Sequence, residues 1–204
     1  KYDILEEMRL ELDRLYREDR SAYDKFRAAL KDNTWESLEE NWKLWNPVPK
    51  NHIVWEGQND CTCRLLPSHP AYEDCAQYGF TSCEYDLHGS PNFDAVTFPD
   101  SIVDISDLYD KLSSENIQKR GGSPHSLQEL AQERMALRLK DVISEWAKAN
   151  NQVDDFYEWR NAHDLVPHED TNCRTLRLVY RPIHTAFMHR GGVANAINIK
   201  NHFS

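Results

Sequence analysis

Residues 162–195 read AHDLVPHEDTNCRTLRLVYRPIHTAFMHRGGVAN, and most of the candidate site residues of the chain lie within them. It places three histidines, His168, His184 and His189, within 22 positions. Neutral imidazole is the commonest metal ligand among protein side chains. A metal-dependent hydrolytic site is therefore the hypothesis that the stretch raises.

The same stretch has a readable backbone pattern. Within His163–Glu169, Leu165 and Val166 favour extended backbone and Pro167 excludes helical backbone before it, so this segment is predicted to form a strand that ends in His168 and Glu169. Residues 170–172 are turn formers, and 175–180 alternate as a second strand, which makes a hairpin. Pro182 suits the first turn of a helix, which we expect to carry His184 and His189 until the glycine pair at 191–192.

The rest of the chain is predominantly helical in pattern. Apolar residues recur at helical spacing, or sit among good helix formers, in four further segments. These segments are residues 3–30, 33–45, 126–149 and 153–161. Residues 51–92 lack periodicity and are predicted as long loops with short strands, and 93–105 as one or two short strands broken at Pro99.

These patterns predict an α+β protein in three parts. Residues 1–50 form a helical N-terminal segment, and 51–125 form a loop-rich region with short strands and a cysteine cluster. Residues 126–204 combine helices with the hairpin and its histidines. No apolar run of about eighteen residues is present, so we predict no membrane-spanning helix.

The charge distribution separates the histidine region from the remainder. The chain as a whole has a formal net charge of -10, which is unusual for a nucleic-acid-binding protein. From Trp159 onward, however, the sequence contains six basic residues and only three acidic ones. The local charge around the candidate site is therefore positive.

Four of the five cysteines lie close together in the sequence. Cys61, Cys63, Cys75 and Cys83 could bind a structural zinc ion, although their spacing departs from paired C-x-x-C motifs. Reduced thiols and disulfides are the alternatives. A structural zinc ion at these four cysteines is thus one of three interpretations of the cluster, and the sequence does not decide between them.

The candidate active site combines metal ligands and cations. A divalent ion such as magnesium, manganese, nickel or zinc, held by imidazole and carboxylate, can clamp a phosphate while a nearby His or Glu accepts a proton from water. The expected ligands are His168, Glu169, His184 and His189. The expected phosphate-binding cations are Arg177, Arg181 and Arg190.

The run PHEDTNCRTLRLVYRPIHTAFMHRGGVA, residues 167–194, resembles the C-terminal nuclease domains of bacterial polymorphic toxins in the HNH and endonuclease VII superfamily. The shared order is a Pro-His-His or Trp-His-His start, a Thr-initiated strand, then Leu-His and His-x-Gly-Gly. The upstream GSPNFDAV, residues 89–96, resembles the Gly-x-Pro-Asp-Phe segment of the same domains.

This resemblance implies a ββα-metal (His-Me finger) nuclease core and a DNase activity. It also implies the C-terminal part of a larger secreted antibacterial effector, which acts in the cytoplasm of a target cell and is neutralised by an immunity protein. His168 falls on the first histidine of the family's pair and Glu169 on the second. Either His168 is then the general base and Glu169 a ligand, or Glu169 accepts the proton. Arg177 replaces the family's strand glutamine.

Two other functions remain open at this point. The same fold could hydrolyse RNA. Alternatively, the chain could be a non-catalytic binding or adaptor module in which histidines hold a structural zinc ion and the Trp-rich helix within residues 33–45 recruits a partner.

Overall fold

The computed structural model describes residues 17–21, 49, 51–57, 62–85, 90–118, 125–170 and 175–189. Helices and antiparallel sheets occur together, as predicted for an α+β protein. The chain forms two compact units, of which one includes residues up to Asn92 with Ala186–Arg190, and the other includes Phe93–Thr185. Apart from residues 17–21, the two predicted N-terminal helices lie outside the described residues.

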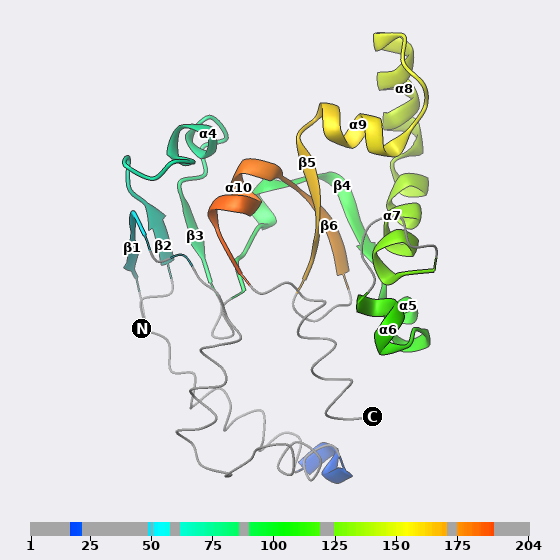
Figure 1. Cartoon of the computed structure of the whole chain (residues 1–204), viewed down its shortest axis with the longest axis horizontal. Coiled ribbons are helices and arrows are strands. Elements are labelled where there is room, and N and C mark those ends of the chain that lie inside the picture. Colours follow the sequence, from blue (N-terminus) through cyan, green and yellow to red (C-terminus); the bar gives the residue numbers. More distant parts are fainter. Residues whose placement is uncertain are drawn as a thin grey trace. The chain divides into compact units, whose positions relative to one another are not determined.

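The first unit contains a small sheet where loops with short strands were expected. Strands β1 (Ile53–Glu56), β2 (Thr62–Leu65) and β3 (Ser82–Glu84) pair antiparallel in the order β1-β2-β3 (Figure 1). Helix α4 (Tyr72–Ala76) lies between β2 and β3 in the chain. The strands are only three or four residues long, so their alternation was too short to read from sequence.

The second unit is built on a three-stranded antiparallel sheet, β4-β6-β5. Strand β5 (Leu165–Glu169) pairs with β6 (Thr175–Tyr180), which confirms the predicted hairpin. Strand β4 (Thr97–Asp104), which follows the 3-10 helix η2 (Asp94–Val96), pairs with the other edge of β6. The second unit therefore begins at residue 93, because β4 belongs to the same sheet as the hairpin.

Pro99 does not end β4, contrary to the prediction. The strand runs through it, and its register with β6 shifts between Thr97 and Ile102. Asp100, within the shifted stretch, has a positive φ of 60°. Proline is tolerated there because β4 is an edge strand with an irregularity, where a missing N–H does not interrupt the ladder.

The predicted helix over 126–149 is two helices. Helix α7 (Leu127–Arg138) and helix α8 (Lys140–Asn150) are separated at Leu139, which is 1% exposed. No glycine or proline marks this break. The outer ends agree with the sequence, since Ser126 caps α7 through a hydrogen bond from the Glu129 N–H and Asn151 ends α8 in left-handed conformation.

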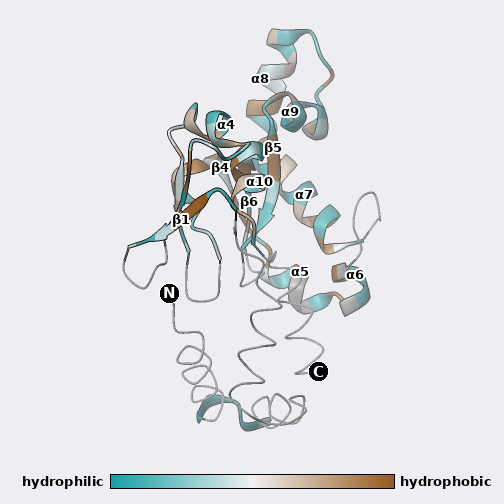
Figure 2. Cartoon of the chain, turned by 60° about the vertical axis from the view of Figure 1, so that its left-hand side comes forward, coloured by the Kyte–Doolittle hydropathy of each residue, from teal (hydrophilic) through white to brown (hydrophobic). Residues whose placement is uncertain are grey.

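Three shorter helices complete the second unit's helical side. They are α5 (Ser106–Lys111), α6 (Ser114–Gln118) and α9 (Phe156–Ala162). Helix α7 contacts β4, and α9 contacts β5. Hydrophilic and hydrophobic residues alternate along α7 and α8 (Figure 2), as expected of helices with one face on a core.

The core lies between these helices and one face of the sheet. Its members from the sheet include Val103, Leu165, Leu176 and Leu178, and Trp159 of α9 is completely buried among them. Because strand side chains alternate, Arg177 lies on the opposite face. Helix α10 (Arg181–Ala186) lies on the other side of the sheet from α7 (Figure 1).

Helix α10 follows β6 directly and has Pro182 in its first turn, as predicted. The helix ends at Ala186, well before the glycine pair. The prediction that the helix carries both histidines is therefore wrong for His189, which lies beyond the helix end.

Candidate metal centre

His168 stands near the end of β5, on the side of the sheet away from the core. In the β5–β6 register it lies opposite Arg177. Its side chain is nearly buried, with the residue 4% exposed. The ring makes an edge contact with Phe93, at 5.0 Å between centroids, and with His184, at 5.4 Å. The apolar contact with Phe93 restricts rotation of the imidazole.

His184 and His189 complete a group of three imidazoles. One ligand nitrogen from each of His168, His184 and His189 lies within 4.8 Å of the other two. His184 comes from α10, and His189 follows it by five residues. Separations of this size suit ligands that converge on one ion, since each Zn–N bond is about 2.0–2.1 Å long. The three predicted histidines are thus brought together.

The segment that carries His189 is anchored by its neighbours. The Tyr85 hydroxyl donates to the Met188 carbonyl at 3.0 Å, and the Phe80 and Phe187 rings meet edge to face at 5.5 Å. The Nδ1 of His189 lies 3.0 Å from the Phe187 carbonyl oxygen. A carbonyl only accepts, so Nδ1 carries the proton and Nε2 carries the lone pair that a metal ion binds.

Glu169, the predicted fourth ligand, is not part of this group. It pairs with Leu176 in the β5–β6 register and shares the face of the sheet on which Leu176 packs into the core. Its residue is 9% exposed. Consecutive strand residues point to opposite faces, so Glu169 points away from the side that His168 occupies.

Asp170, the next residue, is a carboxylate that contacts His168. Its Oδ1 lies 3.4 Å from Nε2 of His168, and its Oδ2 accepts from Nη2 of Arg177 at 2.8 Å. Burial alone would raise the pKa of Asp170, but the contacts with His168 and Arg177 outweigh burial and hold that pKa below its usual value. Asp170 is therefore a carboxylate at neutral pH.

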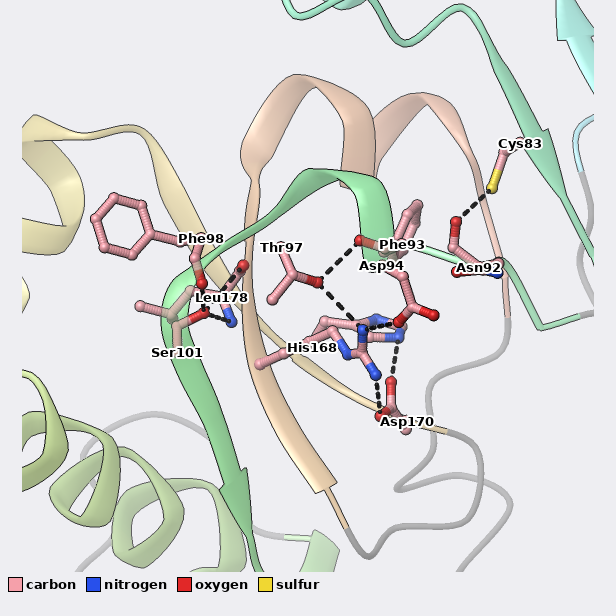
Figure 3. Close-up of polar contacts among 11 residues, drawn as sticks. Cys83, Asn92, Phe93, Asp94, Thr97, Phe98, Ser101, His168, Asp170 and Leu178 are labelled. Carbon is pink, nitrogen blue, oxygen red and sulfur yellow. Dashed lines mark hydrogen bonds and ion pairs between the residues drawn. The ribbon is translucent and has the colours of Figure 1, made fainter.

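The Arg177 guanidinium forms ion pairs with carboxylates and is not exposed at the surface, where it could bind a phosphate. Besides Asp170, its Nη1 donates to Asp94 at 2.6 Å and to the Thr97 hydroxyl at 3.1 Å. Its side chain is only 13% exposed. Figure 3 shows Asp94, Thr97 and Asp170 on the same side of the hairpin as His168. This set, Asp94, Thr97, Asp170 and Arg177, is called the Arg177 network below.

Of the other two arginines predicted to bind phosphate, Arg181 and Arg190, the structure describes only Arg181. Arg181 donates from Nε to Asp164 at 2.8 Å, and both side chains are about half exposed. Arg190 lies outside the described residues. Among the three predicted phosphate-binding arginines, Arg181 is thus the one that the structure describes at an open surface.

The cysteines do not form a metal group within the described part of the chain. Cys63, Cys75 and Cys83 are buried free thiols, and Cys61 lies outside the described residues. Burial raises the pKa of Cys63 to about 12 and that of Cys75 to about 11, and it raises that of Cys83 further. Among the described residues, the group that could hold a metal ion contains only histidines, and these three cysteines lie in the core.

The segment before β4 contributes residues that the sequence analysis did not assign to the site. Phe93 is 1% exposed and contacts both His168 and His184, with ring centroids 5.0 and 6.0 Å apart. Asp94 binds Arg177. The only sequence signal for their place was the resemblance of the segment around them, residues 89–96, to the upstream segment of toxin nucleases.

The donor set fits a borderline divalent cation. Three neutral imidazoles bind zinc, nickel, copper or iron well, whereas magnesium and calcium prefer oxygen ligands. With Glu169 on the other face, the three histidines favour the first class. A site with three histidine ligands also leaves a coordination position for water or substrate.

No family model, curated protein or solved structure matches the chain. No helix within the described residues is long and apolar enough to cross a membrane.

Proposed function

We propose that the chain is a metal-dependent phosphodiester hydrolase of the ββα-metal type, with DNA as its substrate. The observation that carries the proposal is the convergence of His168, His184 and His189 on one point from a hairpin and the segment that follows it. The resemblance of residues 167–194 to toxin nuclease domains supports the same activity. The effector context, with an immunity protein as partner, rests on that resemblance alone.

In this proposal the three histidines hold the cation, and each does so through one neutral ring nitrogen. When bound, the cation acts as a Lewis acid that polarises the scissile phosphodiester and activates water. His168 is buried and held by Phe93, so its position changes little when substrate arrives. Glu169 receives no proton-transfer role, because its strand position directs it to the core face.

Substrate binding in this proposal does not depend on Arg177. Its positive charge is compensated by two carboxylates, so it adds little net attraction for a phosphate. Arg181, at about half exposure, is the described cation closest in sequence to His184 and is assigned to the phosphate backbone. Arg190, adjacent to His189 in sequence, is the second candidate.

A cleavage assay with matched variants tests the proposal. Purified chain, stripped of metal, is incubated with supercoiled plasmid DNA or with RNA, and zinc, nickel, manganese or magnesium is added. We expect nicking of DNA with the imidazole-binding metals, and its loss in His168→Ala and His184→Ala. His125→Asn is the control, because His125 is exposed, lies outside the group and has a φ of 69° that asparagine tolerates.

The assay also assigns the role of His168. Loss of cleavage together with loss of bound metal identifies a ligand, whereas loss of cleavage with metal retained identifies the general base. Cleavage of RNA alone would change the substrate but keep the chemistry. No cleavage of either polymer by a metal-loaded chain would contradict the proposal.

A structural zinc module is the second candidate, because the burial of His168 is compatible with it. A ligand that is 4% exposed suits a closed site as well as an open one. Metal removal separates the two candidates. A structural ion stabilises the fold outright, so a chelator would lower the melting temperature strongly, whereas a catalytic ion at an open site exchanges with a smaller change.

A further inference from the structure

We infer that Asp170, held by Arg177, is a positioning residue that fixes the imidazole of His168 for metal binding. The inference rests on the proposed metal site and adds a residue to it. Asp170 was predicted only as a turn residue, yet its carboxylate contacts the two side chains that lie opposite each other in the β5–β6 register.

The contact with Asp170 selects one tautomer of His168. Oδ1 of Asp170 lies 3.4 Å from Nε2 of the ring, and a carboxylate oxygen only accepts. The proton of a neutral His168 imidazole is therefore favoured on Nε2, and Nδ1 carries the lone pair. Metal-binding histidines commonly have such a partner on the second nitrogen, which fixes both the tautomer and the ring orientation.

The carboxylate of Asp170 is held in place by Arg177 and by its own backbone. Asp170 immediately follows the end of β5. Its backbone N–H still donates a hydrogen bond to the Thr175 carbonyl of β6, at 3.0 Å. Its second oxygen is bound by Nη2 of Arg177 at 2.8 Å. Arg177 is itself fixed by Asp94 and by the Thr97 hydroxyl. The carboxylate thus has one oxygen for the guanidinium and one for the imidazole.

The charges around Asp170 also favour a bound cation. Arg177 brings one positive charge against the two carboxylates of Asp94 and Asp170, so the network carries a net negative charge next to His168. A negative charge on the far side of an imidazole increases the basicity of the ligand nitrogen and stabilises a bound cation. The same arrangement disfavours direct binding of a phosphate by Arg177.

Cobalt(II) titrations of the full chain test this inference, read by affinity and by the visible absorption of the bound ion. For Asp170→Ala we expect affinity about 10–100-fold weaker than wild type, with a changed absorption band. Asp170→Asn keeps the side-chain size but places an amide donor toward Nε2. It should also weaken binding, because it favours the proton on Nδ1.

Asp164→Asn is the matched control. Asp164 also forms an ion pair with an arginine, Arg181, at 2.8 Å, and its positive φ of 51° suits asparagine. This variant should bind cobalt as wild type does. Circular dichroism of each variant checks that it is folded.

The outcomes separate this inference from the proposed function. If wild type binds cobalt and both Asp170 variants bind it with unchanged affinity and spectrum, the positioning role is overturned and the metal site stands. If wild type itself binds no cobalt, the metal site fails and the positioning role fails with it.

Discussion

Arg177, in the middle of β6, donates to Asp94 at 2.6 Å across 83 positions of sequence. The contact joins the segment before β4 to the hairpin that carries His168. Arg177 also binds Asp170. The Arg177 network therefore ties β6, the segment before β4 and the end of β5 together beside the candidate metal centre.

Arg177→Met should lower the free energy of unfolding by about 1.5–3 kcal/mol, because it removes charged hydrogen bonds at a site where Asp170 is mostly buried. Urea denaturation measures the change. Arg64→Met is the control, since the Arg64–Glu56 pair is more than 40% exposed on both sides and should contribute less than about 1 kcal/mol. Equal effects for the two variants would contradict a special role for Arg177.

The stabilising effect of Asp170 should depend on pH in a defined direction. Its pKa is held below the ordinary value of 3.8, so its contribution is fully present above that value and is lost as pH falls through the lower folded-state pKa. The stability difference between wild type and Asp170→Asn should be present at about pH 5 and above and should shrink below about pH 4. Denaturation curves at several pH values measure it, and a difference that grows on acidification would contradict the assignment.

Metal binding should weaken on acidification. Imidazole must be neutral to bind a metal, so up to three protons compete with the ion and its affinity should fall as the pH is lowered. Calorimetric titration with zinc at pH 8, 7 and 6 measures both the affinity and the proton release. Affinity that stays constant down to pH 5 would indicate ligands other than histidine.

Cys63, Cys75 and Cys83 should react slowly with thiol reagents in the folded protein. All three are buried, and burial raises the pKa of each thiol, so little thiolate is present at pH 8. Mass-spectrometric mapping after brief alkylation should find them labelled only when denaturant is added. Rapid labelling of the folded chain would contradict their place in the core.

The hairpin and its helix could be predicted from sequence because their signals are local. The alternation over 175–180 and the positions of Pro167 and Pro182 fix the backbone without information from distant residues. The break between α7 and α8 could not be predicted in this way. Leu139 is buried at that break. The position of the break depends on this tertiary packing, because no local helix breaker marks it.

The site was predicted in part for the same reason. Because side chains alternate along a strand, His168 and Glu169 must point to opposite faces of the sheet, and Asp170 to the same face as His168. The faces of these three side chains could therefore be predicted from the sequence. The roles of Phe93 and Asp94 were not. They arise from pairing of β4 with β6 over about 80 residues of sequence, and no local pattern specifies that pairing.

X-ray absorption of the chain loaded with one equivalent of zinc tests the central claim most directly, because it identifies the ligand atoms. The three-histidine centre predicts a shell of nitrogen or oxygen at about 2.0–2.1 Å with the outer-shell scattering of imidazole, and loss of that signal in His184→Ala. A sulfur shell at about 2.3 Å, or a wild-type chain that binds no zinc, would contradict it.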